Sequence, residues 1–247
     1  MKSQIKNYIF KTVFFKVMRK LRMLLHLRKT WVLAIILITF VFYVFKNSGE
    51  DNLKVVHKCE VTSEQKLNLF NLLKRVSATL EKLKVSYFLC YISLWGAIQE
   101  SGPLPWDTNA ELCILSSNLL PYDEASIHRA FQRQELSLEY KSSEGEYIVK
   151  NSSVLYAQAP QVKLILFEAD SRVGGMFRRV GWKRRLLPPD CDAHPDLQCF
   201  PPHLINSPLP KKSFGPLNLP GPREDIDLLK FHYPDTWWKP LKPNCQA

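Results

Sequence analysis

The chain has 247 residues, room for about one domain, and its hydrophobic content of 46% is enough for a packed core, which excludes a wholly disordered protein. Its formal charge of +11 is unevenly placed, because residues 1–29 hold nine Lys and Arg and no acid while the rest holds 25 basic and 23 acidic residues. A globally basic nucleic-acid-binding protein is thereby disfavoured, and no nucleic-acid partner is expected.

An uncharged segment follows the basic one. Residues 30–45 are bounded by Lys29 and Lys46 and would span about 24 Å as a helix, which suits the thin membranes of the early secretory pathway. Flanking positive residues stay cytoplasmic. The pattern therefore predicts a basic cytoplasmic tail at 1–29, a transmembrane anchor at 30–46 and a luminal remainder, as in a single-pass type II protein.

Two other interpretations of the apolar segment remain open, a cleaved signal peptide and a buried helix of a soluble domain. A signal peptide usually has a shorter basic region, and no small-x-small cleavage site follows Phe45. The luminal topology also agrees with the sequon at Asn151, a predicted glycosylation site. All six cysteines follow the span, as expected in an oxidising compartment: Cys59, Cys90, Cys113, Cys191, Cys199 and Cys245.

The luminal part begins with a polar stem at 47–61. Thr62-Ser63-Glu64-Gln65 is typical of a capped helix start, and apolar residues recur at helical spacing through the following LNLFNLLKRVSATLEKLK. Residues 85–93 are aromatic and β-branched and predict a buried strand, with a short helix at 94–100 before Gly102 and Pro103.

Alternating elements continue along the chain. We expect a strand at 111–115, a helix at 123–139, and strands around 145–149, 154–157 and 162–167. This order predicts a mixed α/β domain over residues 62–247. From Leu187 onward the chain holds 13 of its 17 prolines, which predicts an ordered but irregular C-terminal wrap.

The informative stretch is CYISLWGAIQESGPLPWDTNAELCIL at residues 90–115, a strand that leads into Ser-x-x-Gly, then Pro-Trp-Asp and a second strand. Together with VKLILF at 162–167 and the aromatic YPDTWWKP end, it resembles the fukutin and LicD family of phosphosugar transferases. The resemblance covers about residues 62–244 and implies a nucleotidyltransferase-like α/β fold.

In that family a Gly-Ser/Thr turn cradles phosphate, and two acids on the next strand hold a divalent metal. The resemblance assigns the turn to Ser93 and Gly96, and the acids to Asn109 and Glu111 with Asp107 nearby. It implies Mg²⁺ or Mn²⁺ as cofactor, because an oxygen-ligated dication offsets charge that develops at phosphorus. It also implies transfer of a phosphorylated alditol or phosphocholine from a cytidine-nucleotide donor to a glycan.

Four positions depart from the family pattern. Ile92 stands where the turn needs Gly, Gln99 where an Arg is expected, Asn109 where the first acid is expected, and Ile165 at the acid of the third strand. One carboxylate and one amide are a poor match for a hard dication.

Three interpretations of the acid motif follow. The first is a catalytically silent family member. The second is an active enzyme with a displaced metal site at Asp107 and Glu111, helped by Glu168 or Asp170. The third treats Asp107 and Asn109 as turn residues and Glu111 as an ordinary strand residue.

Two further clusters have open interpretations. Cys191 and Cys199, with His194 and His203, could form a disulfide, hold zinc, or do neither, and the disulfide is favoured. The basic run over 172–185 is either a solvated loop or a loop that binds an anionic donor or glycan. The residues assigned to substrate in the second case are Arg178, Arg179, Arg184 and Arg185.

The sequence thus predicts a protein of the Golgi membrane, or of the endoplasmic reticulum, that takes part in glycoprotein glycan modification. The favoured role is a divergent or silent transferase homologue that serves as scaffold or regulator. An active metal-dependent transferase is the alternative. The expected partners are the membrane, a glycoprotein or glycan acceptor, and another Golgi transferase.

Overall fold

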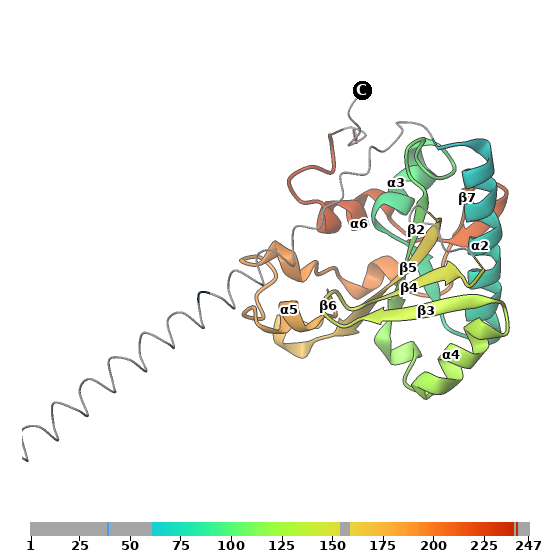
Figure 1. Cartoon of the computed structure of the whole chain (residues 1–247). Coiled ribbons are helices and arrows are strands. Elements are labelled where there is room, and N and C mark those ends of the chain that lie inside the picture. Colours follow the sequence, from blue (N-terminus) through green and yellow to red (C-terminus); the bar gives the residue numbers. More distant parts are fainter. Residues whose placement is uncertain (1–38, 40–60, 154–158, 240, 242–247) are drawn as a thin grey trace, which may run out of the picture. The chain divides into compact units, whose positions relative to one another are not determined.

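The structure is a computed structural model that describes residues 39, 61–153, 159–239 and 241 (Figure 1). The chain divides into two compact units, one at 1–56 and one at 57–247. In the first unit only Thr39, a residue of the predicted anchor, is described, and it is helical and exposed. The predicted tail, the rest of the anchor and the stem before Val61 lie outside the described residues. Among the described residues, no helix is both long and apolar enough to cross a bilayer.

A mixed β-sheet organises the second unit. Six strands of the described residues form it in the order β1-β2-β5-β4-β3, with β6 paired to β5. β2 and β5 run parallel, and every other pair is antiparallel. The predicted mixed α/β class is therefore confirmed. The strands are β1 (Tyr87–Leu89), β2 (Asn109–Leu115), β3 (Leu136–Lys141), β4 (Glu146–Asn151), β5 (Gln161–Ala169) and β6 (Phe177–Arg179).

Helix α2 (Ser63–Lys82) begins where its cap is predicted. The Thr62 side chain accepts the Gln65 backbone N–H, and the Gln65 side chain accepts the Thr62 N–H in return. The helix packs its buried face across β2, β4 and β5, with Leu69, Leu73 and Val76 fully excluded from solvent. This burial of an apolar stripe, more than helix propensity, holds α2 in place.

Three predicted elements are wrong in extent. The expected strand at 85–93 is only β1, because the chain turns at Cys90 and helix α3 (Tyr91–Gln99) begins at once, not at residue 94. The expected helix at 123–139 ends early, as α4 (Glu124–Gln132). Leu136 instead begins β3, where pairing with β4 buries it completely. The strand predicted at 154–157 lies outside the described residues.

The C-terminal segment is irregular, as predicted, but it also contains short elements. A hairpin of β7 (Lys211–Phe214) and β8 (Leu217–Pro220) packs near β1 and α3, and α6 (Asp225–His232) packs on α3. Phe200, Phe214 and Leu228 from this segment are fully buried. The remaining short helices are α5 (Trp182–Arg185) and the 3₁₀ turns Ser116–Asn118, Ser171–Val173, Pro195–Leu197 and Pro202–Ile205.

Candidate functional site

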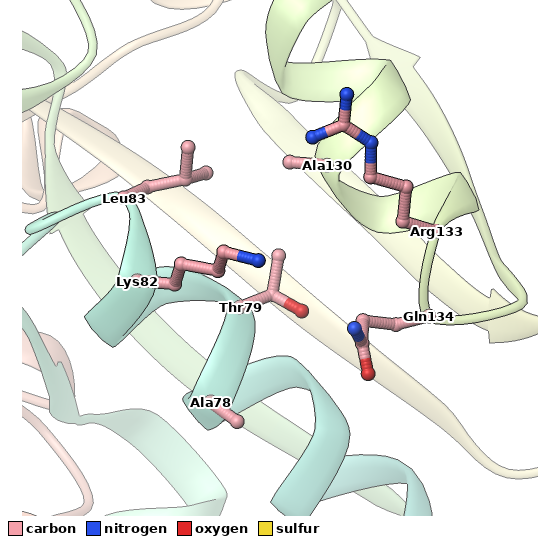
Figure 2. A pocket seen from close by; sticks show the side chains of 7 residues that line it. All are labelled: Ala78, Thr79, Lys82, Leu83, Ala130, Arg133 and Gln134. Carbon is pink, nitrogen blue, oxygen red and sulfur yellow. The ribbon is translucent and has the colours of Figure 1, made fainter.

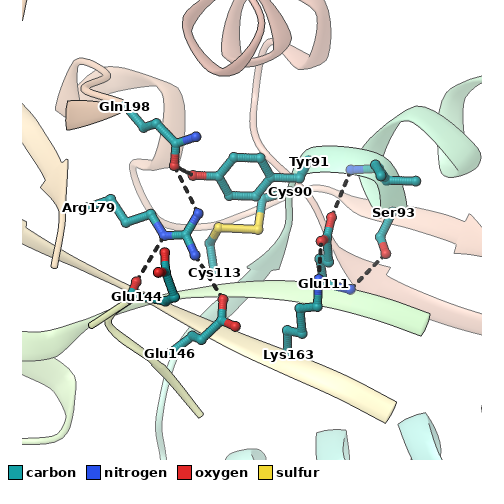
Figure 3. The surroundings of a disulfide bond; sticks show 11 residues. Cys90, Tyr91, Ser93, Glu111, Cys113, Glu144, Glu146, Lys163, Arg179 and Gln198 are labelled. Carbon is teal, nitrogen blue, oxygen red and sulfur yellow. Dashed lines mark hydrogen bonds and ion pairs between the residues drawn. A yellow bond between two sulfur atoms is a disulfide. The ribbon is translucent and has the colours of Figure 1, made fainter. Parts of the chain in front are cut away.

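The acid motif lies at the start of β2, beside β5. In the parallel register Glu111 is the partner of Lys163, and Cys113 is the partner of Ile165. Since alternate residues of a strand point to the same face, all four side chains lie on one face of the sheet. The start of α3 covers Glu111 on this face (Figure 3).

Both carboxylate oxygens of Glu111 have partners within the domain. Oε2 accepts the backbone N–H of Ile92 at 3.0 Å, and Oε1 lies 3.3 Å from the Lys163 ammonium. The Glu111 backbone N–H in turn donates to Ser93 Oγ at 2.7 Å. The Glu111 residue is only 9% exposed. It therefore joins β2, β5 and α3 in a shielded contact (Figure 3).

The backbone at the start of α3 explains the contact with Glu111. Tyr91 has φ +49°, a left-handed conformation that is uncommon for a bulky residue. The first turn of a helix has N–H groups without helical partners, which favour an anion. Here the domain's own Glu111 carboxylate is that anion.

Asp107 lies close enough to Glu111 and Lys163 for both charges to act on it. Its Oδ1 accepts the Asn109 backbone N–H at 2.9 Å, which closes the Pro-Trp-Asp turn. Burial raises the pKa of the Asp107 carboxyl to about 6; the Glu111 charge raises the pKa further, while the Asn109 hydrogen bond and the Lys163 charge oppose the rise. Burial and the Glu111 charge thus disfavour the ionised form of the Asp107 carboxyl.

These residues do not fit the divalent metal that the resemblance implies. A hard dication is held by several oxygen ligands, and carboxylates are the strongest of these. Glu111 uses one oxygen on Ile92 N–H and faces Lys163 with the other, so a cation of the chain already stands beside it. Among the residues that the structure describes, no group of three or more His, Cys, Asp or Glu side chains could hold a metal ion.

Lys163 is the residue of this site that sequence reasoning missed. The resemblance predicts the acid of the third strand at Ile165, two residues after Lys163 in β5. Ile165 is buried beside Cys113. A cation within a buried strand is unusual, since Lys is rarely buried without a partner. The Val-Lys-Leu-Ile-Leu-Phe pattern could have suggested a partner for Lys163, but it could not name Glu111.

Glu168 and Asp170 do not complete a displaced metal site. Glu168 is five residues beyond Lys163, so it lies about 16 Å along β5 and on the alternate face. Arg178 binds both acids, at 2.8 Å from Glu168 and 2.8 Å from Asp170. Both carboxylates are therefore used in an ion-pair cluster far from Glu111.

The arginines assigned to substrate divide between two clusters. Arg178 is buried, and with the exposed Arg185 it lines a cavity of about 390 Å³ that also includes Glu168 and Asp170. Arg179 and Arg184 lie elsewhere, on the acids of the β3–β4 hairpin. The expectation of a solvated loop is wrong for Arg178 and Arg179, because both are held by internal carboxylates.

Arg179 links β4 and Gln198 to Tyr91 at the start of α3 (Figure 3). Its guanidinium lies 2.8 Å from Glu146 and donates to Gln198 at 3.0 Å. Gln198 also accepts the Tyr91 hydroxyl at 2.6 Å, and the guanidinium carbon is 5.6 Å from the Tyr91 ring centre. Arg184 lies 3.6 Å from Glu144 in the same region.

Two disulfides are present in the described residues. Cys191 and Cys199 are bonded, which agrees with the favoured alternative and uses both thiolates that a zinc site would need. Cys90 and Cys113 form the second, a pairing that the sequence did not suggest. This second disulfide is fully buried, directly before Tyr91 and two residues after Glu111 (Figure 3).

The remaining predicted positions lie at α3, at β4 and in the turn after α3. A side chain at Gly96 would collide with the carbonyl of Gly102, so the tight return of the chain after α3 requires glycine there. Ser93 accepts a β2 backbone N–H, and Gln99 is exposed at the end of α3. Asn151 ends β4, where its side chain accepts from Ser153; its glycosylation stays a prediction.

His232 at the end of α6 is buried against the same helix start. Its ring stacks on Tyr91 with centres 3.9 Å apart, and neither ring nitrogen has a hydrogen-bond partner among the described residues. Burial, assisted by the Arg179 charge, lowers the pKa of His232 to about 3. Folding therefore keeps this imidazole neutral at pH values where the unfolded chain would protonate it.

We expect His232→Phe to reduce the acid sensitivity of the domain. Between pH 6.5 and 3 the unfolded state binds a proton at His232 that the folded state does not, so stability falls as pH falls. At pH 5 this loss is about 2 kcal/mol. Urea unfolding at pH 7 and pH 5 measures it, with exposed His203→Phe as control. Equal losses in wild type and His232→Phe would contradict the assignment.

Comparison with known protein families shows where this domain belongs. The family model described as LicD/FKTN/FKRP, nucleotidyltransferase domain, matches residues 84–224, more than half of the chain. The matched segment runs from just before β1 to the start of α6 and includes the whole acid motif. No curated protein matches the chain.

Proposed function

The chain belongs to the LicD/FKTN/FKRP nucleotidyltransferase family, and we propose that it acts in glycan modification as a non-catalytic member, a scaffold or regulatory partner of an active transferase. The observation that carries this proposal is the contact of Glu111 with Ile92 N–H and Lys163. Family members place a phosphate at the helix turn and a metal at the acids. In this chain Glu111 and Lys163 supply an anion and a cation at those two places.

The proposal includes a location. We propose that residues 30–46 anchor the chain in a Golgi membrane, or in that of the endoplasmic reticulum, with the family domain in the lumen. The basic block at 1–29 and the apolar segment support this orientation. The two disulfides of the described domain support an oxidising compartment. We propose a glycoprotein or glycan acceptor and another transferase of the same compartment as its partners.

Genetic complementation with Glu111→Gln tests the proposal. In cells that lack the chain, a glycan modification that depends on it is measured, and wild type or variant is supplied. We expect Glu111→Gln to restore the modification fully, because a scaffold needs the fold and not the carboxylate. The amide oxygen still accepts the Ile92 N–H, so the variant retains the helix contact.

The same experiment tests the active-enzyme alternative. If Asp107 and Glu111 bind metal during catalysis, loss of one carboxylate would abolish complementation while the protein level stays unchanged. The matched control is Glu100→Gln, which removes an exposed carboxylate at the end of α3. Failure of Glu111→Gln together with success of Glu100→Gln would overturn the scaffold proposal.

A further inference from the structure

A groove lies between α2 and α4, away from the Glu111 contact. Its volume is about 280 Å³. Figure 2 shows that the lining side chains come from the C-terminal part of α2 on one side and from the end of α4 and the following turn on the other. They are Ala78, Thr79, Lys82, Leu83, Ala130, Arg133 and Gln134.

The groove combines apolar side chains with two cations that have no partner in the described part of the chain. Among the described residues, neither the Lys82 ammonium nor the Arg133 guanidinium has an ion-pair or hydrogen-bond partner, and the Gln134 side-chain amide has none. No lining residue is acidic. This contrasts with the arginines of residues 178–185, all of which have a carboxylate of the domain within 4.0 Å.

The acids next to the groove in the sequence have other partners among the described residues. Glu81 accepts the Tyr87 hydroxyl, and Glu135 lies 3.9 Å from Arg75. Arg75 itself donates to the backbone carbonyl of Gln134, which fixes the turn after α4 against α2. This hydrogen bond joins the two walls, while the Lys82 and Arg133 side chains have no partner among the described residues.

We propose that this groove docks an acidic segment of a partner protein, with one carboxylate between Lys82 and Arg133 and a small apolar side chain on Ala78 and Ala130. Charge complementarity selects an acidic occupant, since both cations would gain a carboxylate partner. The volume accommodates one or two side chains, so the contact is local. This inference rests on the proposed scaffold function and names the surface that serves it.

A labelled peptide tests the groove on the full chain. The probe is fluorescein-Ala-Leu-Glu-Leu-Ala-amide, and the readout is fluorescence polarisation at low salt. We expect saturable binding that weakens at least tenfold in Lys82→Glu/Arg133→Glu and when the peptide's Glu is replaced by Gln. The matched control is Lys74→Glu/Lys141→Glu, an equal charge change at exposed lysines outside the groove, which should bind as wild type does.

Each other outcome overturns the inference. It fails if the peptide does not saturate, if the Gln peptide binds equally, or if both double variants lose binding alike. Preference of the groove cations for phosphatidylserine vesicles over the peptide would also overturn it. Equal thermal unfolding of the variants excludes misfolding. The groove variants leave Glu111 unchanged, so the two experiments can fail separately. If Glu111→Gln complements but the wild-type chain does not bind the peptide, only the groove proposal is rejected. If the wild-type chain binds the peptide but Glu111→Gln does not complement, only the scaffold proposal is rejected.

Discussion

Replacing Lys163 by Asp is expected to give the chain a response to Mn²⁺ that the wild type lacks. The substitution removes the ammonium 3.3 Å from Glu111 and places a third carboxylate near Glu111 and Asp107. Three carboxylates suit a hard dication, and without metal they repel one another. The variant should therefore be less stable than wild type in chelator and recover with Mn²⁺.

The size of the recovery follows from ligand linkage. At a Mn²⁺ concentration 100 times the dissociation constant, binding stabilises the folded state by about 2.7 kcal/mol. For a unit of this size that is a rise of about 5–10 °C in the unfolding temperature. Differential scanning fluorimetry of the full chain with EDTA or MnCl₂ measures it.

Lys163→Met is the matched control for this prediction. It removes the charge and supplies no ligand, so Glu111 loses its ion pair and the chain loses stability without gaining a metal response. A Mn²⁺-dependent rise in wild type would mean that the Glu111 contact opens to metal. No rise in Lys163→Asp would mean that the acids do not converge.

The features that were predictable from the sequence are local ones. The start of α2 was predictable, because Thr62 and Gln65 are three residues apart and cap each other. β5 was too, as a run of buried β-formers. The start of α3 was not predictable. The apolar run VSYFLCYIS is as typical of one long strand as of a strand followed by a helix, and the chain turns at Tyr91 through an unusual positive φ.

The parts of the site that could not be predicted depend on pairs distant in sequence. Glu111 and Lys163 are 52 residues apart and meet only through the parallel register of β2 and β5. Six cysteines allow fifteen full pairings, so Cys90–Cys113 could not be chosen by spacing. Arg179 is likewise 33 residues from Glu146. The sequence shows charged residues, and the fold decides which of them neutralise each other.

Removing the Cys90–Cys113 disulfide is expected to destabilise the domain strongly although Glu111 is unchanged. The bond joins residues 23 apart, and the loop it closes contains α3 and the acid motif. On loop-closure entropy it contributes about 3 kcal/mol, so Cys90→Ala/Cys113→Ala should lower the unfolding temperature by about 6–12 °C. Both positions are fully buried, and the void adds to the loss.

Cys191→Ala/Cys199→Ala is the control, since that bond joins residues only eight apart and the same relation gives about 1 kcal/mol less. Thermal and urea unfolding of the full chain, wild type against each double variant, measures both losses. We also expect amide exchange at Ile92 to speed up only in Cys90→Ala/Cys113→Ala, because Cys90 precedes the α3 turn that donates to Glu111. Equal losses in both variants, with Ile92 still protected, would mean that the contact between α3 and β2 does not depend on the disulfide beside it.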